Sequence, residues 1–283
     1  MVKCLGIFRE RQNSPNRQTD DALILKAVME QLQIQRFETF LMEPQAADRE
    51  DLNGWDMIVA MCETYPRLMR LKELANSGRL IVNPPEAVLG CYRVKMMEAF
   101  RRAPGLLYPE TEIRPTAAPF PLDAFSERGV WIKRGDVHNT CDHDVVFALS
   151  WDEAESVRRD FERREISSLL LQRHIDGDLI KFYGVGPGQW FTWFYHDPQT
   201  ARKLPFEIED LAVQAETAAK AVGLEIFGGD AIISSEGPVT IIDINSWPSF
   251  ARVRNEASVQ IARRLRARLR QAQIQTTQDR LNS

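Results

Sequence analysis

The sequence predicts an α/β protein in which a parallel sheet near the N-terminus is followed by two strand-rich antiparallel regions. Near the N-terminus, helical patterns at 20–33 and 67–76 alternate with strand signals at 4–8, 37–42, 57–61 and 80–82. Such alternation is typical of a parallel sheet with helices on its faces. Further along the chain, patterns at 179–195 and 225–245 predict two hairpins, and therefore antiparallel pairing.

The composition is that of a globular protein with more than one domain. The chain has 283 residues, of which 44% are hydrophobic and 27% are charged. This length exceeds that of one ordinary domain. The formal net charge of -4 gives no overall attraction to nucleic acid or to anionic lipid. We therefore expect neither nucleic acid nor membrane as a partner, and any anion site should be local.

The cysteines and the N-terminal residues indicate a cytoplasmic protein. Cys4, Cys62, Cys91 and Cys141 show no CxxC spacing, so we expect free thiols in a reducing compartment. The N-terminal apolar run is short and is followed at once by charge, unlike a signal peptide. No segment has the length of apolar sequence that a membrane helix needs. A homodimer could form, and the sequence leaves the oligomeric state open.

The middle of the chain begins with a proline-rich stretch. Residues 103–125 contain five prolines, which do not suit helices or central strands, so we expect an extended connector between two lobes. Strand and helix signals then follow at 130–134, 145–148, 151–164 and 168–174, with a polar loop at 135–144. Towards the C-terminus, helices are predicted at 208–222 and at about 256–273.

The second hairpin carries the most informative polar residues. If Ser234 pairs with Val239 across the turn, Asp230 lies opposite Asp243, and Asn245 shares the face of Asp243. Two opposed carboxylates repel each other unless a positive charge lies between them. Carboxylate and amide oxygens suit Mg²⁺, so the hairpin predicts a metal site. A solvated sheet face, or neutralisation by a neighbouring Arg, is the alternative.

Five segments in order resemble the ATP-grasp superfamily. They are VNPPEAVLGCYRVK, VWIKRG, LLLQRHIDGD, GGDAII and DINSWPSF. The resemblance covers the whole chain and implies a Rossmann-like domain at 1–85, followed by two antiparallel-sheet lobes that sandwich ATP. The central lobe would span 86–178 and include a lid loop, and the C-terminal lobe would span 179–283 and include the metal site. D-alanine–D-alanine ligases, ribosomal-protein glutamate ligases and inositol-phosphate kinases share this fold.

The resemblance assigns roles to individual residues. It implies Lys95 and Lys133 at the ATP phosphates, Gln172, Arg173, His174 and Ile175 at adenine, Asp178 at the ribose, and Asp230, Asp243 and Asn245 at Mg²⁺. Lys181 resembles a residue that some members direct at phosphate, although a charge on an edge strand is nearly as good an interpretation. For Lys95 the alternative is a solvated helix face. The roles of His138 and His143 in the lid loop stay open.

The substrate is expected to be a small anion. Arg252 and Arg254 follow the metal-binding strand and could bind a carboxylate or phosphate in catalysis, and Arg9, Arg11 and Arg17 are further candidates. The resemblance implies an ATP- and Mg-dependent ligase that activates a carboxylate as an acyl phosphate for attack by an amine. A kinase for a polyol or inositol phosphate is the alternative, and a nucleotide-binding protein without turnover is the second. Several peptide-forming ligases of the superfamily have Arg before the metal-binding Asp, whereas this chain has Gly228 and Gly229.

Overall fold

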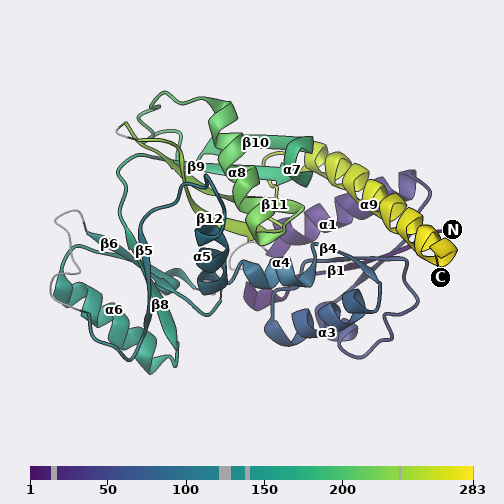
Figure 1. Cartoon of the computed structure of the whole chain (residues 1–283), viewed down its shortest axis with the longest axis horizontal. Helices are drawn as coiled ribbons and strands as arrows, with labels where there is room; N and C mark the ends of the chain where they lie inside the picture. The colour runs from purple at the N-terminus through teal and green to yellow at the C-terminus, as the bar shows by residue number, and fades with distance from the viewer. Residues whose placement is uncertain (14–17, 121–128, 138–140, 236, 283) are drawn as a thin grey trace.

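The computed structural model describes residues 1–13, 18–120, 129–137, 141–235 and 237–282 (Figure 1). The strands are β1 Lys3–Ile7, β2 Glu38–Met42, β3 Met57–Ala60, β4 Leu80–Val82, β5 Thr111–Pro115, β6 Val130–Arg134, β7 Val145–Ala148, β8 Ser168–Arg173, β9 Asp178–Val185, β10 Trp190–Tyr195, β11 Ile226–Ile233 and β12 Thr240–Ser246. The α-helices are α1 Gln18–Ile34, α2 Pro44–Ala47, α3 Tyr65–Asn76, α4 Pro85–Gly90, α5 Arg93–Arg101, α6 Trp151–Arg163, α7 Gly186–Gln189, α8 Ile208–Val222 and α9 Arg254–Asn282. Short 3-10 turns lie at η1 Arg11–Asn13 and η2 Asp142–Asp144.

The described strands form three sheets, and the fold class is α/β as predicted. The N-terminal sheet has the order β2-β1-β3-β4 with parallel neighbours. The central sheet, β5-β8-β6-β7, and the C-terminal sheet, β10-β9-β11-β12, are antiparallel. Each of the three expected segments thus contributes one sheet. The exact domain limits stay a prediction.

The two ends of the chain share one core. Helix α9 returns to lie along α1 at the N-terminal end (Figure 1). Its buried residues Ala257, Ile261, Leu265 and Leu269 recur every four positions, which places them on one face of the helix. They pack in the same cluster as Val28 of α1. The last helix therefore fixes the C-terminal sheet against the N-terminal domain.

The extended connector expected at 103–125 contains an edge strand. Strand β5 lies within this stretch and pairs antiparallel with β8 at the edge of the central sheet. Proline is compatible with an edge strand, because the backbone N–H groups on the outer side of such a strand have no neighbouring strand to bond. Pro115, the last residue of β5, occupies such a position. Residues 121–128 lie outside the described part of the chain.

The central and C-terminal sheets are each covered on one face. Helix α6 packs on the face of the central sheet that carries Val130 and Ile132. Helix α8 packs on the face of the C-terminal sheet that carries Ala231 and Ile233. Because side chains alternate along a strand, the residues between these positions point to the opposite faces. Lys133 of the central sheet reaches β12, so these opposite faces border the cleft between the two sheets.

Four cysteines are free thiols in the structure, three of them buried. In the described part of the chain, no helix is both long enough and apolar enough to cross a membrane.

Candidate functional site

The hairpin of β11 and β12 brings two carboxylates together. Asp230 pairs with Asp243, and Asn245 pairs with Gly228 two positions further along the same strands. Residues two apart on a strand share a face, so the two carboxylates and the amide lie on one side of the sheet. The pairing predicted for Asp230 and Asp243 is confirmed. Their use as metal ligands stays a prediction.

A β-bulge lies on the turn side of these carboxylates. The register shifts by one beyond Asp230, so that Ala231 pairs with Ile241 and Ile242 has no cross-strand partner of its own. The expected closing pair of Ser234 with Val239 is therefore off by one. The bulge has a consequence for the site, because the carbonyl oxygen of Ile242 accepts a hydrogen bond from Lys133.

Close packing explains the two glycines before Asp230. A Cβ atom on Gly228 would lie 2.7 Å from Cγ of Pro248 and 3.0 Å from the carbonyl oxygen of Phe182. A Cβ atom on Gly229 would meet the carbonyl oxygen of Asp243. A larger residue, such as the Arg of some peptide-forming ligases, would force β11 away from its neighbours.

Lys181 extends the row of charges to the adjacent strand. It pairs with Asp230 across β9 and β11, and its Nζ lies 2.7 Å from Oδ1 of Asp230. Burial raises the pKa of Asp230, while Lys181 opposes the shift and Asp243 adds to it. The neutralising neighbour of the acidic pair is thus a lysine rather than an arginine. A role of Lys181 at phosphate stays a prediction.

Asn245 supplies an oxygen without a donor. Its Oδ1 atom is buried and accepts no hydrogen bond from the described residues. A buried acceptor in this state is costly unless a ligand satisfies it. The described residues contain no group of three or more His, Cys, Asp or Glu that could hold a metal ion. Two carboxylates and one amide oxygen nevertheless fit Mg²⁺, which takes few protein ligands when phosphates and water fill its other positions.

Lys133 approaches this group from the central sheet. It is only 8% exposed, and its Nζ donates to the carbonyl oxygen of Ile242 at 3.3 Å. Burial lowers the pKa of Lys133 to about 8, although Asp243 favours the charged form. The structure therefore places Lys133 beside the carboxylate pair, and its role at phosphate stays a prediction.

Arg93, which sequence reasoning missed, lies on the same helix as Lys95 and interacts with Asp243. Arg93 begins α5, is 1% exposed, and donates from Nη1 to the carbonyl oxygen of Arg134 at 3.1 Å. Burial lowers the pKa of Arg93, and among the acids Asp243 opposes this shift most. Lys95 lies two residues later on the helix and is exposed. Positions two apart point in different directions on a helix, so only one of the two can face the cleft.

An aromatic group lies on the same face of the central sheet as Lys133. Trp131 precedes Lys133 by two residues on β6, and its ring is 4.9 Å from that of Phe147. Its Nε1 donates to Nδ1 of His174 at 3.2 Å, and the rings of Phe147 and His174 are 5.0 Å apart. Alternation along 130–134 could have indicated that Trp131 shares a face with Lys133. His174 is the residue in this group that the resemblance implied.

The other residues expected at adenine lie at the end of β8 and just after it. Gln172 is buried and donates to Oγ1 of Thr111 at 3.1 Å. Gln172 pairs with Trp131, so it lies on the cleft-facing side of the sheet. Arg173 and Ile175 line a pocket of about 640 Å³ with the turn of the β11–β12 hairpin.

Asp178 holds a segment that follows β10. Its side chain is buried and accepts hydrogen bonds from the backbone N–H groups of Arg202 and Leu204, at 2.7 and 2.8 Å. Both carboxylate oxygens are therefore engaged in holding this segment. Asp178 thus has a structural role, and its binding of a ribose stays a prediction.

The two arginines after β12 diverge. Arg252 is exposed, and its guanidinium lies 4.3 Å from the centre of the Phe194 ring. Phe194 pairs with Lys181 on β9, so Arg252 lies above the charged face of the sheet. Arg254 instead forms an ion pair of 2.6 Å with Asp20 of α1. The structure brings Arg252, but not Arg254, to the face that carries the carboxylates.

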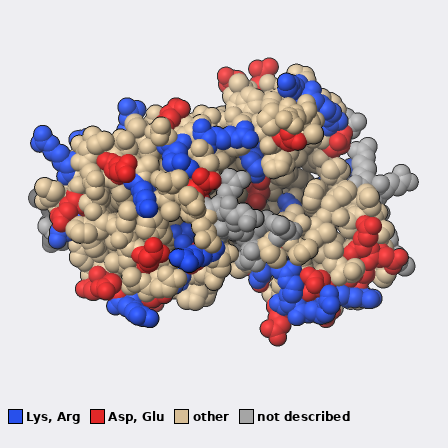
Figure 2. All heavy atoms as spheres, turned by 180° about the vertical axis from the view of Figure 1, so that it is seen from behind, with Lys and Arg blue, Asp and Glu red and all other residues tan. Residues whose placement is uncertain are grey.

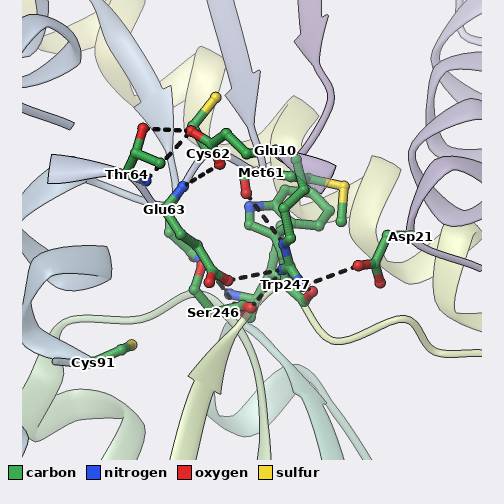
Figure 3. A network of polar contacts seen from close by, with 12 residues as sticks. Glu10, Asp21, Met61, Cys62, Glu63, Thr64, Cys91, Ser246 and Trp247 are labelled. Atoms are coloured by element: carbon green, nitrogen blue, oxygen red, sulfur yellow. Dashed lines mark hydrogen bonds and ion pairs between the residues drawn. The ribbon is translucent and has the colours of Figure 1, made fainter. Parts of the chain in front are cut away.

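Arg9 joins the N-terminal domain to the end of β12, and Figure 3 labels its partners Asp21, Glu63, Ser246 and Trp247. Its guanidinium lies 3.2 Å from both Asp21 and Glu63, and it donates to the carbonyl oxygens of Ser246 and Trp247. These contacts engage Arg9, so it is a poor candidate for binding substrate. Arg11 lines a separate pocket with Lys26.

Seen from behind, the molecule has a hollow near its middle in which acidic and basic side chains are both visible (Figure 2).

The expected lid lies only partly within the described residues. His143 is exposed within η2, whereas His138 and Arg17 lie outside the described residues.

Comparison with known proteins identifies the fold. No family model and no curated protein matches the chain. Among solved structures, a D-alanine–D-alanine ligase from Coxiella burnetii aligns over 100% of this chain and 99% of its own, with a TM-score of 0.74 and 13% identity. One from Bacillus anthracis, complexed with ATP, aligns over 96% and 99%, with a TM-score of 0.73 and 10% identity. A RimK domain ATP-grasp protein from Sphaerobacter thermophilus aligns over 93% and 99%, with a TM-score of 0.70 and 16% identity. The chain therefore has the ATP-grasp fold.

Proposed function

We propose that this protein is an ATP- and Mg-dependent ligase that converts a small carboxylate into an acyl phosphate for attack by an amine. The observation that carries the proposal is the meeting of opposite charges at one end of the cleft. Asp230 and Asp243 face the cleft from one sheet, and Lys133 and Arg93 reach the same place from the other side. Such a group suits a metal-bound triphosphate better than it suits an unliganded core.

Each part of the nucleotide then has a counterpart in the chain. The aromatic group of Trp131, Phe147 and His174 would stack on adenine. Lys133 and Arg93 would bind the phosphates, and Arg93 takes over the role first expected of Lys95. Asp230, Asp243 and Asn245 would hold Mg²⁺. When bound, this ion would neutralise phosphate charge and fix the phosphates for transfer.

The residues of the chain would assist phosphoryl transfer mainly by position and charge. Lys133 and Arg93 would stabilise negative charge that moves from the γ-phosphate to the leaving diphosphate. Arg252 has no acidic partner among the described residues and lies above the charged face, so it would hold the carboxylate of the acceptor. An amine would then form the amide bond as the carbon–oxygen bond to phosphate breaks and inorganic phosphate leaves.

The names of the structural neighbours support a ligase, and the retained carboxylate pair argues against a protein that only binds nucleotide.

The test is a screen for ADP release with pools of carboxylates, amines and polyols, in the presence and absence of hydroxylamine. Hydroxylamine intercepts acyl phosphates as hydroxamates. A ligase should form a hydroxamate with ATP and one carboxylate pool. ADP release with polyols alone, and no hydroxamate, would establish the kinase alternative and overturn the proposal.

A further inference from the structure

A further pocket lies beside the phosphate end of the cleft. Its volume is about 350 Å³, and its lining includes Glu63, Tyr92 and Arg134. Tyr92 and Arg134 directly adjoin Arg93 and Lys133 in the chain, so the pocket borders the residues assigned to phosphate. The hydroxyl group of Tyr92 donates to the backbone carbonyl oxygen of Glu63 at 2.7 Å, which fixes the start of α5 against the end of β3.

Arg9 connects this pocket to the metal end of the hairpin. One guanidinium nitrogen, Nη2, lies 3.2 Å from Oε1 of Glu63, 3.1 Å from the carbonyl oxygen of Ser246 and 2.6 Å from that of Trp247. Ser246 directly follows Asn245 in the chain. In Figure 3, Glu63 and Ser246 lie close together at the centre of the polar network. A ligand in the pocket would therefore lie near an acceptor that is being phosphorylated.

Two side chains at this pocket have acceptor atoms that receive no hydrogen bond from the described residues. No hydrogen bond from the described residues to a side-chain oxygen of Glu63 accompanies its ion pair with Arg9, in which Nη2 lies 3.2 Å from Oε1. Oδ1 of Asn13, another lining residue, is buried and also has no donor among them. The Glu63 side chain is only 14% exposed, so little water reaches it. Two unsatisfied acceptors favour a ligand that brings several N–H donors.

The charges around the pocket favour a cation rather than an anion. Arg134 is the basic residue of the lining, but its guanidinium is already engaged by Asp136, with contacts of 2.5 and 3.1 Å. Glu63 shares Arg9 with Asp21. Burial raises the pKa of Glu63 to about 7, although Arg9 opposes the shift. A bound ammonium group would return this carboxyl group to its charged form.

We infer that this pocket binds the ammonium group of the amine substrate, that Glu63 and Oδ1 of Asn13 accept its hydrogen bonds, and that the Glu63 carboxylate takes the proton that the ammonium loses before its nitrogen attacks the acyl phosphate. The inference rests on the proposed ligase function and extends it, because it assigns the amine to a pocket separate from the carboxylate held by Arg252. A substrate recognised in this way carries a primary amine, and Glu63 and Asn13 determine specificity for it.

Binding can be tested with two small probes of the same shape. Glycinamide carries an ammonium group, and glycolamide carries a hydroxyl group in its place. In thermal-shift titrations in the presence of Mg-ATP, glycinamide should stabilise the wild-type protein and glycolamide should not. Glu63→Gln and Asn13→Ala should each weaken the response to glycinamide about 10- to 100-fold in midpoint concentration, the range expected for a lost charged hydrogen bond. Equal responses to both probes, or an unchanged midpoint in both variants, would overturn the inference.

A kinetic comparison separates this inference from the proposed function. Hydroxylamine is small and uncharged at neutral pH, so its capture of the acyl phosphate does not need an ammonium site. In Glu63→Gln, the ratio of amide formation to hydroxamate formation should fall about 10- to 100-fold relative to wild type. Glu86→Gln is the matched control, since Glu86 is an exposed acid on α4 that pairs with Lys72. An unchanged ratio would overturn the ammonium site, whereas wild-type protein without hydroxamate formation would overturn the ligase proposal.

Discussion

Binding of ATP should draw a proton onto Lys133. In the free protein, burial lowers the pKa of Lys133 to about 8, from 10.5 in the unfolded chain. Phosphate groups beside Nζ would raise this pKa again, because a negative charge favours the ammonium form. From a pKa near 8, uptake should be about 0.1 proton per ATP at pH 7, about 0.5 at pH 8 and about 0.9 at pH 9. Affinity for ATP should accordingly fall as the pH rises through 8.

Calorimetric titrations in two buffers of different ionisation enthalpy measure this uptake directly. Measurements between pH 8 and 9 are the most informative, because the γ-phosphate of ATP is already ionised there. Lys133→Arg keeps the positive charge but does not titrate in this range, so its uptake should be close to zero. No uptake by the wild-type protein at pH 8, or equal uptake by the variant, would refute the placement of Lys133 at the phosphates.

Three further predictions concern stability, adenine and acceptor. Asn83 is 1% exposed and makes four hydrogen bonds, to Glu225, Ile226 and Ser246. The substitution Asn83→Ala should therefore lower the free energy of unfolding, measured in urea titrations, by about 2–4 kcal/mol. The control Asn53→Ala, at an exposed position, should change this free energy little. Trp131→Ala should weaken ATP binding by about 1–3 kcal/mol in calorimetry, the usual range for stacking of a base on an aromatic ring, and Trp55→Ala should not. Equal affinities of these two variants would rule out stacking. Arg252→Ala should raise the KM for the carboxylate about 10-fold or more while the affinity for Mg-ATP is unchanged, and an unchanged KM would place the acceptor elsewhere.

The paired carboxylates could be predicted because they depend on local periodicity. Side chains on a strand alternate strictly, so a turn signal and a count of residues bring Asp230 opposite Asp243. The bulge at Ile242 could not be foreseen, since it depends on packing against neighbouring strands. The predicted pair of Asp230 and Asp243 is nevertheless correct, because two shifts of one residue cancel. The true register at the turn differs by one residue from the assumed register, and the bulge shifts the pairing back by one residue.

Contacts between distant segments account for the features of the candidate site that could not be predicted from the sequence. Whether Arg93 or Lys95 faces the cleft depends on how α5 is rotated against the central sheet, and the positions of the two residues in the sequence do not indicate this rotation. Asp178 is engaged by a segment more than twenty residues later, through backbone N–H groups that carry no sequence signal. The aromatic group formed by Trp131 and His174 likewise joins two strands that are neighbours only in space.

The most direct test is whether Mg²⁺ couples ATP binding to the paired carboxylates. Thermal unfolding should be measured with ATP in Mg²⁺ and in EDTA, for the wild-type protein and for Asp243→Asn, which keeps the shape of the side chain. At an ATP concentration 100 times the dissociation constant, wild-type protein in Mg²⁺ should gain about 2.7 kcal/mol of stability, and far less in EDTA. Asp243→Asn should lose most of the difference between the two conditions. If Asp243→Asn keeps the full Mg-dependent gain, the hairpin does not hold the metal, and the proposed site is wrong.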